Sequence, residues 1–182
     1  MITYFVSGDE DIEPSTTNLR ATGRAVRHGA EFGEEAVAAL AAGGRFVVVA
    51  HGDESGTVYF RPGVAEPQRR WLWVGMEPTP ARTRVYLYCC KAGPEITKYL
   101  ADCECLGHSD IVPIPAGPDY REALMFLDAV DALMDEHEFR ADPWRYQLQQ
   151  FVAEQLDDAL AVATEQNYRP VCVWKMLARS LA

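Results

Sequence analysis

Positive charge is scarce in this chain of 182 residues, in which 17 lysines and arginines stand against 27 aspartates and glutamates, giving a net charge of −10. Binding to a nucleic-acid backbone depends on clustered cationic side chains. Arg20, Arg24 and Arg27 fit one helix face, and Arg69 and Arg70 fit a loop, but groups this small are typical of solvated surface. The sequence therefore predicts a protein that does not bind nucleic acid.

Long apolar runs are also lacking. No window holds the roughly 18–20 consecutive apolar residues that a membrane helix requires, and the N-terminal stretch MITYFVSGDED turns acidic where a secretory signal would remain apolar. We therefore expect no membrane association and a location in the cytoplasm. The five cysteines are an odd number, which argues against a disulfide framework in that compartment. Their thiols are left for packing, metal binding or catalysis.

Short apolar runs alternate with helical patterns along the chain. Strands are predicted at Ile2–Val6, Phe46–Ala50, Arg84–Tyr88 and Cys103–Leu106. Helices are predicted over about 19–28 and 33–42, from Pro94, over 120–138 and from Asp142. The TVYFRPG and WLWVGM runs fit a hairpin or an edge addition to the sheet. The PVCVW run fits a final strand or an apolar tail. This alternation predicts a parallel sheet within one α/β domain over residues 1–182.

Two of the predicted strands end in residues that carry chemistry. The run FVVVA leads directly into His51 and Gly52, and the run VYLY leads into Cys89 and Cys90. Because functional crevices of parallel sheets lie beyond the carboxyl ends of the strands, we expect His51 and Cys90 to meet there. The imidazole could take the thiol proton, assisted by the positive end of the helix from Pro94. The amides of Gly52 and Cys90 would then stabilise an oxyanion.

Packing explains the same residues without any chemistry. Histidines commonly end strands in turns, and free cysteine is among the most buried residue types. Alternation along the strand sends Cys89 and Cys90 to opposite faces, so at most one of them can point at His51. From the spacing alone, packing is the simpler interpretation of the pair.

Taken together, the motifs VVVAHG and VYLYCCKAG resemble the histidine and cysteine motifs of caspase-like (clan CD) peptidases, most closely those of bacterial CHAT-domain and metacaspase-like proteases. The likeness implies a three-layer fold in which helices flank a mostly parallel central sheet. It also implies that His51 is the general base, Cys90 the nucleophile and Gly52 a donor to the oxyanion hole, with Cys89 at the small position before the nucleophile. Two features depart from the pattern: the N-terminal third lacks a clear second strand, and Ala92 stands where many relatives have Ser or Thr.

The resemblance implies a cysteine endopeptidase that cleaves a protein substrate with a Cys-His dyad and needs no cofactor. Bacterial relatives act in regulated cleavage, including defence and cell-death systems. Since the sequence shows no regulatory domain, control would fall to an activating protein partner. The alternative is a catalytically inactive member of the same fold that serves as a binding or scaffold subunit.

The stretch CECLGHSD supplies further candidates. Cys103, Cys105 and His108 could bind zinc with a fourth ligand from elsewhere, but C-x-C on a strand is not the paired knuckle of structural zinc sites, and we expect no metal. His108 and Asp110 are expected to border the crevice and contact substrate, where the Asp110 carboxylate would favour cleavage after Arg or Lys. Asp110 could instead cap its own turn.

Two acidic residues follow the candidate base almost directly. Asp53 and Glu54 could orient the His51 imidazole, as the acid of a catalytic triad does. They fit a solvated hairpin turn equally well, and the sequence leaves both interpretations open.

Overall fold

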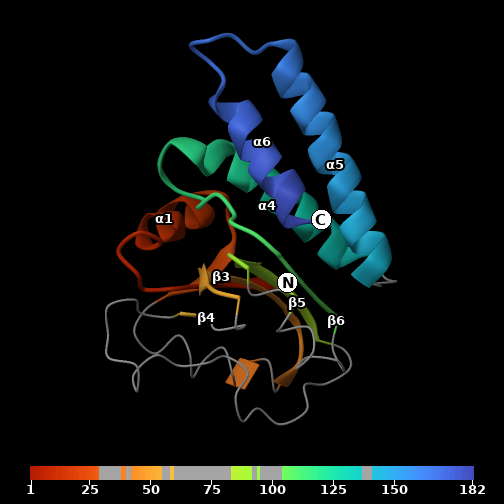
Figure 1. Cartoon of the computed structure of the whole chain (residues 1–182). Helices are drawn as coiled ribbons and strands as arrows, with labels where there is room; N and C mark the ends of the chain where they lie inside the picture. The colour runs from red at the N-terminus through yellow and green to blue at the C-terminus, as the bar shows by residue number, and fades with distance from the viewer. Residues whose placement is uncertain are drawn as a thin grey trace.

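A computed structural model describes residues 1–28, 38–39, 42–54, 58–59, 83–91, 94, 104–136 and 141–182. Five strands pair in parallel in the order β2-β1-β3-β5-β6, and a short sixth strand, β4, runs antiparallel to the end of β3 (Figure 1). The strands are β1 (Ile2–Val6), β2 (Ala25–His28), β3 (Arg45–Gly52), β4 (Val58–Tyr59), β5 (Arg84–Cys89) and β6 (Glu104–Gly107). The helices are α1 (Glu13–Ala21), α4 (Tyr120–Asp135), α5 (Ala141–Ala161) and α6 (Arg169–Ser180), with a 3-10 turn, η2 (Gly117–Asp119), before α4.

The predicted α/β class with a mostly parallel sheet is confirmed. Strands β1, β3 and β5 lie where unbroken apolar runs predict them, since a parallel strand covered on both faces needs apolar side chains on both. Within the part of the chain that the structure describes, no helix combines the length and apolarity needed to cross a membrane.

Two segments of the predicted fold are wrong. The helix expected over 19–28 begins earlier, at Glu13, and ends at Ala21, and Ala25–His28 forms β2 beside β1. The second strand that the sequence seemed to lack is therefore present. PVCVW is neither strand nor tail but the start of α6, with Pro170 in the first turn, where its missing N–H has no helical partner to lose.

Other expectations fall partly or wholly outside the described residues. Residues 38, 39 and 42 are helical, as is Pro94, but most of the helices predicted around them lie outside the described ranges. The same holds for the WLWVGM run and for Cys103. Of the predicted hairpin, Val58–Tyr59 is described, and it pairs with the last two residues of β3.

The core lies between the sheet and the helices α4, α5 and α6, which gather on one side of it (Figure 1). Alternate residues of β3 and β5 face these helices, and the rings of Tyr86 and Tyr88 pack against Phe126 of α4. On the other face Val48 and Leu87 are also fully buried. Burying such a side chain contributes about 1.5–3 kcal/mol, so the strands are held in place from both sides.

Helix α4 presents one apolar face to this core. Its buried residues recur at helical spacing: Ala123, Phe126, Leu127, Val130, Leu133 and Met134. Beside this face, Asp128 and Asp131 form ion pairs with Arg24, the residue before β2. Helix α4 thus joins the sheet through apolar contacts and through a set of ionic ones.

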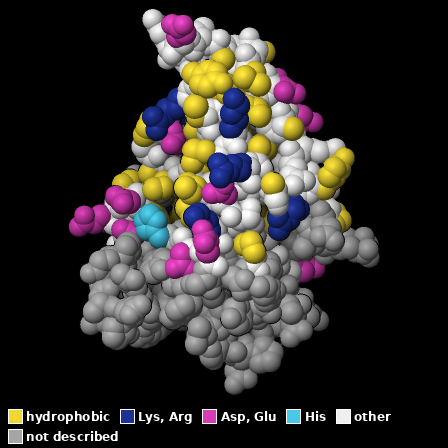
Figure 2. Space-filling view, viewed as in Figure 1, with side chains coloured by type: hydrophobic (Ala, Val, Ile, Leu, Met, Phe, Trp, Pro, Cys, Tyr) yellow, Lys and Arg dark blue, Asp and Glu magenta, His cyan; other side chains and the backbone are white. Residues whose placement is uncertain are grey.

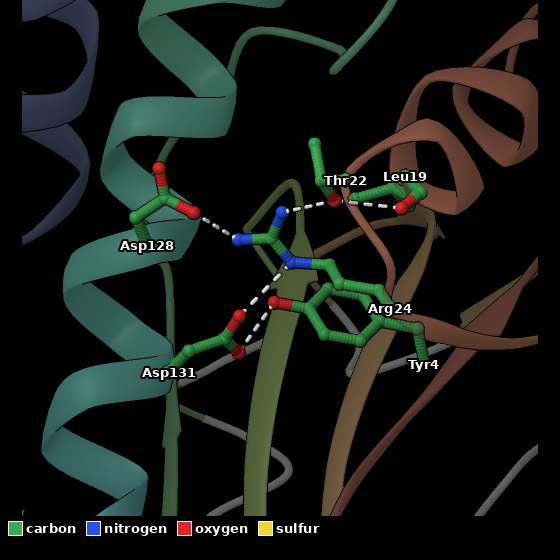
Figure 3. A network of polar contacts seen from close by, with 6 residues as sticks. All are labelled: Tyr4, Leu19, Thr22, Arg24, Asp128 and Asp131. Carbon is green, nitrogen blue, oxygen red and sulfur yellow. Dashed lines mark hydrogen bonds and ion pairs between the residues drawn. The ribbon is translucent and has the colours of Figure 1, made fainter.

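Arg24 is the centre of that polar network (Figure 3). Its Nε donates to Asp131 at 2.9 Å, its Nη2 donates to Asp128 at 2.5 Å, and its side chain is only 8% exposed. The Tyr4 hydroxyl of β1 donates to the second Asp131 oxygen at 2.6 Å, and Arg24 also donates to Thr22, which caps α1. Burial and the Asp131 charge raise the pKa of Tyr4, which keeps this hydroxyl a donor. The network joins β1 and the α1–β2 turn to α4.

We expect Arg24→Ala to lower the free energy of unfolding by about 2–3 kcal/mol, because it leaves the partly buried Asp131 carboxylate without its cation. The loss should stay below the roughly 3–5 kcal/mol of a fully buried pair, since water reaches Asp128. Urea unfolding measures it. Arg20→Ala, an exposed arginine on α1, is the matched control and should change stability by less than about 0.5 kcal/mol. Equal effects of the two variants would show that the network contributes little.

Candidate active site

The register of three strands brings the candidate residues to one edge of the sheet. Ala50 of β3 is level with Cys89 of β5, so His51 and Cys90 follow at the same height. On the other side of β3, Val6 of β1 is level with Val49, and the Ser7 amide donates to the Val49 carbonyl at 2.9 Å. The loop after β1 is therefore carried to the same edge.

The two adjacent cysteines have different surroundings. Cys89 is completely buried, its sulfur lies 3.6 Å from the Val48 carbonyl oxygen, and burial raises its pKa. Cys90 is half-buried and lines two cavities at the sheet edge. The expectation from alternation holds, and Cys90 is the cysteine that shares the crevice with His51.

The chain turns sharply after Cys90. Lys91 has a φ of 56°, the left-handed region that an L-residue other than glycine seldom adopts. Its amide donates to the Asp110 carbonyl at 3.1 Å, and its ammonium pairs with Glu54 at 2.8 Å. These contacts hold a strained residue next to the candidate nucleophile, as is common at functional sites.

An acidic residue that the sequence did not single out lies beside His51. Asp9 Oδ2 is 3.1 Å from His51 Nε2, and the Asp9 side chain is only 9% exposed. Its backbone carbonyl accepts the amides of Ile12 and Glu13, which fixes the loop at the start of α1. Of the two residues predicted for this role, Glu54 pairs with Lys91 and Asp53 lines the larger cavity. Asp9 could have been found from its place in the loop after β1, because β1 pairs with β3, the strand that carries His51.

Two cavities open on the pair. The larger, about 430 Å³, is lined by charged and apolar residues around His51 and Cys90: Gly52, Asp53, Glu54, Lys91 and Ile111. The smaller, about 210 Å³, also reaches His51 and Cys90, but its walls are mostly apolar: Ile12, Val112, Pro113, Ile114 and Pro115. A cavity of mixed polarity thus adjoins a mostly apolar pocket.

The wall of the apolar pocket comes from the segment between β6 and α4, which is anchored at both ends. The Ser109 amide and hydroxyl both donate to the Ser180 carbonyl of α6, at 2.8 and 3.0 Å. Farther along, the Asn18 side chain of α1 donates to the Pro115 carbonyl at 3.1 Å. Two helices therefore fix this segment over the strand ends.

The expectation that His108 contacts substrate is corrected by its position in the core. The side chain is completely buried, with Nδ1 2.7 Å from Ser180 Oγ and Nε2 2.8 Å from the Tyr86 hydroxyl. Since the Ser180 hydroxyl donates to the Leu177 carbonyl, it accepts from His108 Nδ1, and Nε2 accepts from Tyr86. With both nitrogens engaged, His108 is also unsuited to the zinc site considered above.

Asp110 does not supply the free carboxylate predicted for a basic specificity pocket. One oxygen accepts the Ile111 amide at 2.8 Å and the other pairs with Arg179 at 2.5 Å. It lines neither of the two cavities. The turn-capping interpretation is the one that the geometry matches. On the face shown in Figure 2, basic and acidic side chains of the described residues are interspersed.

Burial gives His108 a measurable effect on acid stability. It lowers the pKa of His108 to about 3, whereas the unfolded chain should titrate near ~6.5. The unfolded state therefore binds a proton that the folded state does not, and stability falls as the pH drops below ~6.5. Between pH 7.5 and 5.0 we expect this residue to account for about 2 kcal/mol.

Urea unfolding of the natural protein and of His108→Gln at the two pH values isolates the contribution of His108 to the free energy of unfolding. The carboxylates contribute equally in the two proteins, so their effect cancels in the comparison. The variant should be less stable at pH 7.5 but should lose less stability on acidification. An equal loss in both proteins would contradict the assignment.

Comparison with known proteins adds no relative: no family model, curated protein or solved structure matches this chain. The likeness to caspase-like peptidases rests on the two motifs around His51 and Cys90.

Proposed function

We propose that this protein is a cysteine endopeptidase in which Cys90 is the nucleophile and His51 the general base. The observation that supports it is that both residues, at neighbouring strand ends, line the same two cavities. Cys89 does not compete, because it is buried against Val48. The strained Lys91 and the acid beside His51 fit the same interpretation.

In the proposed reaction, His51 takes the proton of the Cys90 thiol, and the sulfur attacks the carbonyl carbon of a peptide bond. The carbonyl π electrons move to oxygen, and the resulting intermediate collapses as the amine leaves with the proton from His51. Water, deprotonated by His51, then hydrolyses the thioester and releases the acid. The thiol regains its proton from His51, so the enzyme ends as it began.

Asp9 would position the imidazole. Because its carboxylate lies at Nε2, Nδ1 is the nitrogen left to accept the proton of Cys90. A buried carboxylate there also stabilises the imidazolium that forms during the reaction. Gly52 lines the larger cavity beside Cys90, and the amides of these two residues are the proposed donors to the oxyanion.

The apolar pocket suggests the substrate class. It adjoins both reacting residues, and Ile12, Val112 and Ile114 line it. We assign it to a medium-sized apolar side chain, such as that of Leu or Met, next to the scissile bond.

The proposed cellular location is inferred from the cysteines, and the proposed biological role from the resemblance to caspase-like peptidases. The described cysteines are free thiols, which persist in a reducing compartment, and we place the protein in the cytoplasm. The proposed substrate is a protein, cleaved in a bacterial defence or cell-death system under the control of an activating partner.

Alkylation by iodoacetamide near neutral pH tests the dyad directly. Cys90 should react about tenfold or more faster than Cys172, although Cys172 is the more exposed thiol, because His51 would accept the thiol proton as the sulfur attacks. His51→Ala should slow Cys90 and leave Cys172 unchanged, which makes Cys172 an internal control. Mass spectrometry of tryptic peptides gives the rates.

If Cys90 reacts no faster than Cys172, or if its rate is insensitive to His51→Ala, the endopeptidase proposal fails. The catalytically inactive scaffold would then be the better interpretation. Peptidase activity that survives Cys90→Ala would also contradict the proposal.

A fluorogenic peptide library tests the pocket. We expect cleavage after Leu or Met in preference to Arg or Lys. Ile114→Trp should fill the cavity and reduce kcat/KM for the Leu substrate relative to the Ala substrate by about tenfold or more. Leu160→Trp, a change at an exposed site on α5, is the control. Preference for basic residues, or an unchanged ratio in Ile114→Trp, would show that another surface selects the substrate.

A further inference from the structure

Three residues at the sheet edge gather potential metal ligands. Asp9, Asp11 and His51 each offer one ligand atom, and these atoms all lie within 4.8 Å of one another. His51 Nε2 and Asp9 Oδ2 are 3.1 Å apart, whereas two ligands bound to one ion at about 2.1 Å stand roughly 3.0–3.4 Å apart. This pair therefore has the spacing of neighbouring ligands. Asp11 is exposed, so its side chain is free to rotate inward.

The buried member of the cluster points independently to a cation. Asp9 is nine-tenths buried, and its Oδ2 accepts no hydrogen bond in the described part of the chain. Its contact with His51 Nε2 at 3.1 Å is an ion pair only when the imidazole is protonated. A buried carboxylate oxygen without a donor is costly. Two described basic side chains at this end of the sheet have other partners, Lys91 with Glu54 and Arg179 with Asp110. A bound cation would satisfy this oxygen.

We infer that Asp9, Asp11 and His51 form a binding site for a divalent first-row transition cation of the Zn²⁺ class. An imidazole combined with carboxylates favours such ions, whereas Ca²⁺ and Mg²⁺ prefer oxygen ligands throughout. Three protein ligands also leave a coordination position for water. The site differs from the Cys103, Cys105 and His108 set weighed above, and it departs from the expectation of no metal.

Metal binding would switch the proposed dyad off, a consequence that rests on the proposed function. A neutral imidazole has a single nitrogen lone pair. When the metal takes the lone pair of Nε2, the proton resides on Nδ1, which can then no longer accept the proton of Cys90. His51 therefore serves either the metal or the thiol, and the cation acts as a reversible inhibitor.

Zn²⁺ binding is measured first in Cys90→Ala, which has no catalytic thiol, so that the result is independent of peptidase activity. Calorimetry should give one Zn²⁺ per chain, bound at least tenfold more tightly than Ca²⁺ or Mg²⁺. Adding Asp11→Asn should weaken Zn²⁺ binding at least tenfold. Adding Glu10→Gln removes a neighbouring exposed carboxylate outside the cluster and should leave the affinity unchanged. Failure to bind, or equal affinity in the Asp11→Asn background, overturns the site.

The switch is measured next by alkylation of Cys90 in the protein that keeps its thiol. Zn²⁺ should slow alkylation, and Asp11→Asn should require at least tenfold more Zn²⁺ for the same effect, while Glu10→Gln should not. Equal sensitivity in Asp11→Asn would mean that the metal acts on Cys90 directly, and would overturn the switch. Fast, His51-dependent alkylation without added metal tests the proposed peptidase dyad and not the metal site. The two proposals can therefore fail independently.

Discussion

Parallel pairing of β3 with β1 on one side and β5 on the other determines where Asp9, His51 and Cys90 lie. Because the three strands run in the same direction, their carboxyl ends meet at one edge. Residues far apart in sequence, namely Asp9, His51 and Cys90, are thereby brought to one crevice. The burial of both sheet faces fixes the register, since a shift of one residue would turn Cys89 outward and Cys90 into the core.

Much of this fold follows from apolar patterning alone. The runs that form β1, β3 and β5 are mostly apolar, and α4 repeats buried residues at helical spacing. Strand β2 escaped prediction because Ala25–His28 lies at the edge of the described sheet, where four residues of mixed polarity suffice. The β-branched start of α6 suggested a strand, but Val173, Trp174 and Leu177 form a buried helical face, and packing outweighs local propensity there.

The candidate site could be predicted only in part, for a similar reason. His51 and Cys90 can be recognised in the sequence because each follows an apolar run, whereas Asp9 lies in an acidic loop with no motif around it. Its role depends on which strand neighbours β3, and that is a property of topology. His108 shows the reverse case: its place after a strand suggested the crevice, but the Tyr86 and Ser180 hydroxyls satisfy both ring nitrogens inside the core.

The bonds between Ser109 and Ser180 make the pocket wall and the last helix a single cooperative unit. The Ser109 amide donates to the carbonyl at the end of α6, so this amide exchanges with solvent only when that contact opens. Hydrogen exchange at Ser109 consequently reports the local unfolding of α6, although the two segments are 71 residues apart. Fraying at the end of α6 would break these bonds and loosen the pocket wall. The stability of α6 therefore affects the shape of the site.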